Sequence, residues 1–118
     1  MKSVLAPIVF AITSAFLCAV SCAGEPIIIA EGSGKQTPKQ PQAVVAADDT
    51  VHLVYGVGDE VHYCQSDDGG QSFGSPQTAF RTANMSLGMR RGPRVAVAKN
   101  AIVISAIGSA QGKGRDGD

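Results

Sequence analysis

Apolar and polar side chains alternate along several short stretches of the chain, and turn-forming residues separate these stretches. Residues 51–56 and 60–65 show the alternation most clearly, residues 42–47 form a short apolar run, and residues 74–80 form a weaker fourth stretch. A period of two over such short runs is typical of half-buried β-strands and differs from the period of a helix. The pattern therefore predicts an all-β fold whose first unit is a four-stranded antiparallel meander.

The turn after the third stretch, residues 66–73, has a composition suited to a tight loop that satisfies its own main chain. The carboxylate of Asp68 is expected to accept hydrogen bonds from main-chain N–H groups a few residues further on. Gly69 and Gly70 are expected to adopt positive φ angles, which glycine tolerates because it has no Cβ. Phe73 is expected to anchor the loop on the apolar core.

Five positions of this turn resemble the Asp-box, or BNR repeat, of the sialidase-like β-propellers: Ser66, Asp68, Gly70, Ser72 and Phe73. The resemblance implies that the meander is one antiparallel four-stranded blade of such a propeller. In that family the box joins the third and fourth strands of a blade, on the rim away from the active site. The resemblance therefore assigns these five residues a structural role.

A later stretch repeats the beginning of the first unit. Residues 93–98 align with residues 41–46 at an offset of 52, and residues 102–104 align with residues 51–53 after one deletion. A fixed period near the length of a propeller blade indicates a radial repeat. Residues 108–118 are polar, Gly-rich and charged. We therefore expect an incomplete sialidase-like β-propeller of about one and a half blades, that is, an N-terminal fragment.

The organisation that follows has four parts. Residues 1–23 are assigned to a signal peptide, residues 24–40 to an N-terminal strand and linker, and residues 41–80 to the first blade with its Asp-box. Residues 81–118 are assigned to a linker and a partial second blade with a polar tail. Within the second part, residues 26–30 form a β-branched run that is expected to pair as an isolated strand.

Residues 1–23 have the pattern of a secretory signal. Lys2 gives a positive start, residues 4–20 are almost wholly apolar, and small residues precede a cleavage site after Ala23. The apolar run is short for a transmembrane span, so no such span is expected. The alternative to cleavage is a lipid anchor at Cys22, because the residues before it loosely resemble a bacterial lipobox. Both routes predict a secreted or periplasmic protein.

Composition narrows the partners. The 118 residues carry a formal net charge of zero, which gives no reason to expect a nucleic-acid partner. No cofactor is expected. Cys18 and Cys22 fall in the signal peptide, so Cys64 is the only cysteine of the mature chain and forms no intrachain disulfide. Cys64 is expected to be a small buried strand residue.

His52 and His62 lie on strands that are expected to pair, which would bring the two side chains near one another. Cys64 is expected on the same face as His62. A metal site needs further ligands that converge on the same point. Because none is directed at this pair, both residues are expected to be partly buried strand histidines, and no metal site is assigned.

The family resemblance also implies a chemistry. Sialidases bind the substrate carboxylate with several Arg side chains and use a Tyr nucleophile assisted by Glu. Arg94 opens the inner strand of the second unit and is the candidate for substrate binding, together with Arg90 and Arg91 as an anion-attracting patch. The alternative is a solvated Arg at a strand end. Tyr55 and Tyr63 lie within strands, so no catalytic residue is assigned.

The sequence thus predicts an exported, carbohydrate-related, sialidase-like propeller fragment. It is expected to belong to a glycosidase in its complete form and to be inactive by itself, since it lacks the Tyr and Glu pair. The alternative is a non-catalytic extracellular module that binds a glycan or a protein. A third reading is a small β-domain that recruits copies of itself through its open sheet edges.

Overall fold

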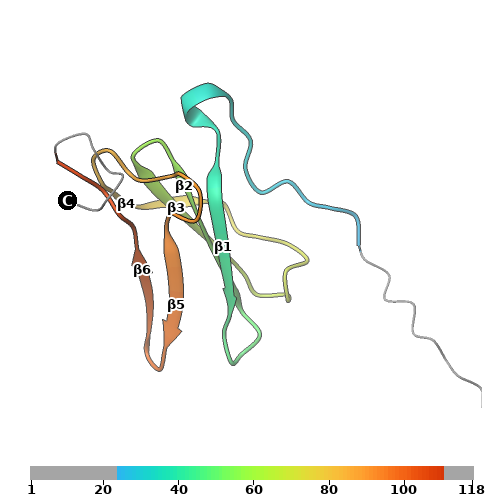
Figure 1. Ribbon diagram of the computed structural model, residues 1–118. Coiled ribbons are helices and arrows are strands. Elements are labelled where there is room, and N and C mark those ends of the chain that lie inside the picture. Colours follow the sequence, from blue (N-terminus) through green and yellow to red (C-terminus); the bar gives the residue numbers. More distant parts are fainter. Residues whose placement is uncertain (1–23, 111–118) are drawn as a thin grey trace, which may run out of the picture.

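The computed structural model describes residues 24–110, so the signal peptide assigned to residues 1–23 and most of the polar tail lie outside the described residues (Figure 1). Within residues 24–110 the secondary structure is all-β, with one short 3-10 turn and no α-helix. No helix of this part is long and apolar enough to cross a membrane. The elements are η1 (Gly34–Gln36), β1 (Lys39–Val45), β2 (Val51–Val57), β3 (Glu60–Ser66), β4 (Gln77–Arg81), β5 (Arg94–Ala98) and β6 (Ala101–Ser105).

The first four strands form the predicted antiparallel meander, in the order β1-β2-β3-β4. β4 is shorter than expected and begins only at Gln77, because the main chain before it still belongs to the corner after β3: Gly74 N donates to Gln65 O at 2.9 Å. Pro76, directly before β4, has no N–H to donate to a ladder. β1 begins earlier than expected, at Lys39, and contains an irregularity between Lys39 and Gln42.

The sheet has two faces with different surroundings. The β5-side face carries Val44, His52, Val54 and Val61, and Val54 and Val61 are 0% exposed. The opposite face carries the alternate residues of the same strands, including Val45, which is 62% exposed. The core therefore has two parts: Val54 and Val61 are buried on the β5-side face, and Tyr55 and Cys64 are buried on the opposite face.

Strands β5 and β6 form a separate two-stranded sheet that contacts β1 and β2 (Figure 1). Its register reproduces that of the first hairpin: Val97 faces Ile102, as Val45 faces Val51. Five residues lie between the paired positions in the first hairpin and four in the second. The single deletion in the sequence alignment is thus a shorter turn.

Two glutamine side chains of β1 connect the sheets. Gln40 Nε2 donates to Gly88 O at 2.7 Å, and Gln42 Oε1 accepts from Val95 N at 2.9 Å. The second contact satisfies a main-chain N–H on the free edge of β5, which would otherwise be buried without a partner. These bonds place the start of β5 beside the start of β1.

Residues 24–33 contain no strand, in contrast to the pairing expected for residues 26–30. The run is β-branched, but a strand forms only where a sheet edge supplies hydrogen-bond partners, and none lies beside it among the described residues. Ile27 and Ile28 are 48% and 75% exposed. The segment instead reaches β1 through the turn η1.

Candidate functional site

The corner between β3 and β4 is built around Ser66 and Asp68. Ser66 is 1% exposed; its Oγ donates to Asp68 Oδ1 at 2.6 Å and accepts from Gly70 N at 2.8 Å. Asp68 Oδ1 also accepts from Ser72 N at 2.9 Å, and Asp68 Oδ2 accepts from Ser72 Oγ at 2.5 Å. The expected main-chain hydrogen bond to the Asp68 carboxylate is therefore confirmed.

These donors determine the protonation state of Asp68. The hydroxyl of Ser66, the hydroxyl of Ser72 and the main-chain N–H of Ser72 lower the pKa of the Asp68 carboxyl far below its ordinary value, in that order of importance. Each donor favours the charged form, because a carboxylate accepts hydrogen bonds better than a carboxylic acid does. Asp68 is therefore ionised under all physiological conditions and acts as an acceptor in the corner.

The backbone of the corner also follows the expectation. Gly69 and Gly70 have φ angles of 71° and 92°, a region that other residues rarely adopt. Phe73 differs: it is only half-buried and lines a surface hollow with residues 27–29.

Arg94 lies at the first position of β5 with an exposed side chain. Its guanidinium donates to two main-chain carbonyls: Nη2 to Arg90 O at 2.8 Å and Nη1 to Pro93 O at 3.3 Å. These bonds hold the preceding loop, in which Arg90 has a φ of 62°. A guanidinium has five N–H donors, so Arg94 can bind the loop and still present a charged surface to solvent.

Strand direction gathers most of the positive charge at one end of the molecule. Lys39 starts β1, Arg81 ends β4, and Arg94 starts β5, and the pairings of Lys39 with Gly56 and of Arg81 with Glu60 bring the first two to the same end. We call this the cationic end. It comprises Lys35, Lys39, Arg81, Arg90, Arg91 and Arg94, with Asp59 and Glu60 as the neighbouring carboxylates.

The other end of the sheet is predominantly acidic. Asp48 and Asp49 form the turn between β1 and β2, and Asp67 and Asp68 belong to the corner after β3. Lys99 lies in the turn between β5 and β6. The chain has a formal net charge of zero, so its composition gives no sign that positive and negative charges lie at opposite ends. The positions of Lys and Arg relative to predicted strand ends would have indicated it.

A surface hollow opens at the cationic end between η1, the turn from β2 to β3, and the segment before β5. Its volume is about 490 Å³. Two lysines, a threonine and an aspartate give it polar walls, and Met85 and Leu87 give it an apolar one. It is lined by Lys35, Gln36, Thr37, Lys39, Gly58, Asp59, Met85 and Leu87.

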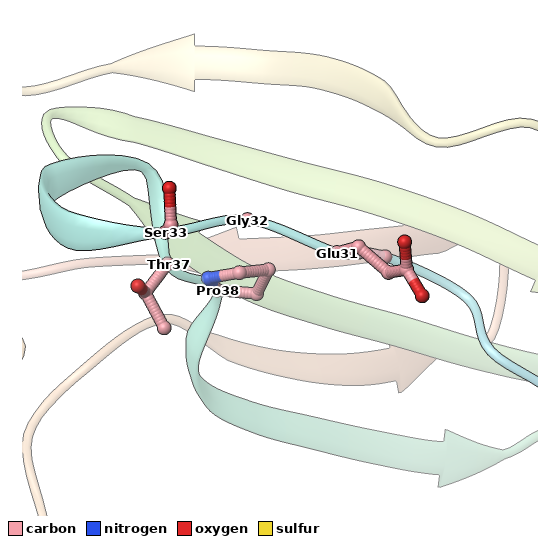
Figure 2. Close-up of a pocket in the computed structure, with 6 residues that line it drawn as sticks. Glu31, Gly32, Ser33, Thr37 and Pro38 are labelled. Atoms are coloured by element: carbon pink, nitrogen blue, oxygen red, sulfur yellow. The ribbon is translucent and has the colours of Figure 1, made fainter.

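A second hollow adjoins the first, where the chain turns back through η1 (Figure 2). Thr37 lines both hollows. Figure 2 shows the hydroxyls of Ser33 and Thr37 on the turn, while the carboxylate of Glu31 points away from them. The turn is tight: a Cβ on Gly32 would lie 2.0 Å from Gln36 O.

Glu60 organises a polar cluster on the opposite face of the first sheet. Its Oε2 lies 3.0 Å from His62 Nε2 and accepts from Thr78 Oγ1 at 3.3 Å, while its Oε1 pairs with the Arg81 guanidinium. The His62 ring stacks on Tyr55 with centroids 5.4 Å apart. The Arg81 guanidinium is therefore paired with a carboxylate, whereas the Arg94 guanidinium donates to the main-chain carbonyls of Arg90 and Pro93.

His52 belongs to a different network, on the β5-side face. His52 Nδ1 lies 2.8 Å from Tyr63 Oη, and Tyr63 Oη donates to Gln65 Oε1 at 2.9 Å. Because the Tyr63 hydroxyl has only one hydrogen, His52 Nδ1 carries the hydrogen of the first bond. His52 is 5% exposed.

The two histidines do not approach one another. The register pairs His52 with Gln65 and His62 with Tyr55, so the imidazoles project from opposite faces of the sheet. The expected proximity of His52 and His62 is therefore wrong. Among the described residues no three His, Cys, Asp or Glu side chains are placed to hold a metal ion.

Cys64 is a buried, free cysteine on β3, 3% exposed. Burial raises the pKa of its thiol, because removal from water disfavours the thiolate. This agrees with the expectation of a small buried strand residue. A thiol in this state is a poor nucleophile.

Comparison of the chain with family models, with curated proteins and with solved structures gave no match.

Proposed function

We propose that the chain forms one blade and part of a second blade of an exported, sialidase-like β-propeller, and that it contributes its cationic end to the recognition of an acidic carbohydrate. One observation carries the proposal: the corner centred on Asp68 and the cationic end containing Arg94 lie at opposite ends of the same strands. The family places its Asp-box and its substrate-binding arginines in this relation.

The chemistry of the cationic end suits a carboxylated sugar. A guanidinium binds a carboxylate through two parallel hydrogen bonds, and the loop carbonyls of Arg90 and Pro93 fix the direction of the Arg94 side chain. The hollow beside Lys35 and Lys39 offers polar groups for hydroxyls and an apolar wall for a sugar ring.

Hydrolysis is not assigned to these residues. Tyr63 has its hydroxyl engaged with His52 and Gln65, and Tyr55 is buried, which raises the pKa of its phenol. Neither is poised as a nucleophile, which would need an ionised or activated oxygen. The described residues therefore offer contacts for binding, which is compatible with the second candidate function, a propeller that binds a glycan or a protein without cleaving it, as well as with the first.

The test is binding of a sialoside to the purified protein, followed by NMR chemical-shift perturbation and with a neutral galactoside as comparison. We expect weak, saturable binding of the acidic sugar, with shifts concentrated at the cationic end. Arg94→Gln, which introduces the residue found at the equivalent position of the first unit, Gln42, is expected to weaken binding by about tenfold, the value of one charged hydrogen-bonded contact.

Lys99→Gln is the matched control, because it removes one positive charge from the opposite end of the same hairpin. It is expected to leave the affinity unchanged. Equal responses to the acidic and the neutral sugar, or equal losses in the two variants, would refute recognition at the cationic end. A fluorogenic sialoside assayed in parallel tests the expectation that the chain does not cleave the sugar by itself, and turnover would contradict that expectation.

A further inference from the structure

The contact between the two sheets involves one defined face of each. On the second sheet, Val95, Val97, Ile102 and Ile104 share a face by strand alternation and register. Val95 is 5% exposed and Ile104 is half-buried, whereas Val97 and Ile102, nearer the turn, are 40% and 42% exposed. β5 contacts β1 and β2 of the first sheet. The part of this apolar face that contains Val95 and Ile104 therefore packs on the β5-side face of the first unit.

The same face exists on the first unit. The internal repeat and the matching registers make Ala43, Val45, Val51 and Leu53 the equivalents of those four residues. They share the opposite face of the first sheet, and we call them the β1–β2 patch. Val45 is 62% exposed, and Val51 and Leu53 are half-buried. No strand of the described residues covers this patch.

The receiving face also has an equivalent. On the first unit it includes Val44, which corresponds to Ala96. The outer face of the second sheet begins with Arg94 and its partner Ser105, and its remaining residues are alanine or valine. We call Ala96, Ala98, Ala101 and Val103 the β5–β6 patch. Val103 is 53% exposed. The molecule thus presents one face of each kind, on opposite sides.

We propose that the β1–β2 patch of one copy of this chain docks on the β5–β6 patch of a second copy, and repeats between molecules the contact that joins the two units within one. The repeat indicates that the partner is a second copy. Within one molecule, the face of the second unit that corresponds to the β1–β2 patch packs on the face of the first unit that corresponds to the β5–β6 patch. Two copies can therefore bring the two patches together in the same way. Such a contact is heterologous, because different patches meet, and each dimer leaves one patch of each kind free.

The patches are uncharged, and this distinguishes the proposed contact from an alternative in which the cationic end of one copy pairs with the acidic end of another. None of the eight patch residues is charged, and burial of exposed valine and leucine side chains drives association without charge. The proposed contact should persist or strengthen at high salt. Pairing of the cationic end with the acidic end would weaken, because salt screens exposed charges.

The test is sedimentation equilibrium of the purified protein at low and high salt, with Ala43→Lys and Val103→Lys as the interface variants. Ala43 is exposed and is the equivalent of Val95, which is buried in the contact within the molecule. Each variant alone is expected to lose self-association by at least about tenfold in Kd, since it places a charge at the centre of a contact. Mixed at equal concentrations, the two variants are expected to form a one-to-one dimer, because each retains the patch that the other lacks.

Met89→Lys is the control, because Met89 is 87% exposed and lies outside both patches, and it should associate like the unchanged protein. Circular dichroism of each variant checks that the sheets form. A protein that stays monomeric at millimolar concentration, an association that disappears in high salt, or a mixture of the two variants that stays monomeric would each overturn the proposal. The last outcome would point to like patches meeting, or to another segment on this face.

Discussion

At the scale of single residues, the corner after β3 is decided by one carboxylate and one hydroxyl. Asp68 accepts from Ser66 and Ser72, and Ser66 in turn accepts from Gly70 N. Neighbouring Asp67 has a lesser role, accepting from the Gln65 amide at 3.2 Å. The two adjacent aspartates thus accept hydrogen bonds from different groups, and the residue type alone does not indicate this difference.

Asp68→Asn is expected to lower the melting temperature between pH 5 and 8, while Asp67→Asn, the adjacent control, has a smaller effect. The pKa of Asp68 is lowered in the folded state, so its stabilisation is complete above the ordinary value of 3.8 and is lost as the pH falls from there through the folded pKa. Thermal unfolding across pH measures this. The difference in melting temperature between the unchanged protein and Asp68→Asn should become smaller below pH 3.8. A difference that stays constant across this pH range would contradict the prediction.

At the scale of elements, two kinds of hydrogen bond hold the strands in place: main-chain ladders within each sheet, and side-chain bonds between the two sheets. β1 to β4 are held by ladders, whereas β5 meets β1 without a ladder and relies on Gln42 for its exposed edge. A side chain therefore performs a function that the main chain performs elsewhere. This makes the position of the second sheet sensitive to a single residue.

Gln42→Ala is expected to destabilise the packing of the second sheet by about 1–3 kcal/mol, because it leaves the N–H of Val95 buried without an acceptor. Amide hydrogen exchange measures the effect by element. Protection should fall in β5 and β6 and persist in β2 and β3. Gln77→Ala, on the exposed β4, is the control and should change neither. Uniform loss of protection would show that the two sheets unfold as one unit.

At the scale of the whole molecule, the separation of charge follows from strand direction. Two antiparallel hairpins that start at the same end bring Lys39 and Arg94 together although 54 residues lie between them in the chain. The apolar patches on opposite sides follow from the repeat in the same way. Arg94 and Ala96 share a face of β5, so the proposed sugar site adjoins the β5–β6 patch. The two proposals are tested by substitutions of different residues.

Export is the remaining prediction for the whole molecule. Expressed with its natural N-terminus in a bacterial host, the protein is expected to appear outside the cytoplasm with Gly24 as its first residue, since small residues precede the predicted cleavage site. Intact mass spectrometry measures this. A lipid-modified Cys22 at the N-terminus would show the alternative route, and Cys22→Ser would abolish that modification while leaving cleavage after Ala23 unchanged. Retention of the full 118 residues in the cytoplasm would contradict both.

The local pattern predicted much of the fold. Alternation, a short apolar run and the internal repeat located all six strands to within a few residues. The glycines and Asp68 predicted the corner, because turn signals act over neighbouring positions. The faces of His52 and His62 were not predictable in this way. A shift of one residue in register moves every side chain to the other face, and the turn at Gly58 and Asp59 decides it.

The sequence by itself determined the strands, the corner and the repeat, since these depend on contacts between residues close in the chain. Only the tertiary structure decided which face of each strand is buried, that residues 26–30 stay unpaired, and that positive charge gathers at one end. These features depend on register and on strand direction, and both are set by pairing between distant segments whose free energies no local pattern contains.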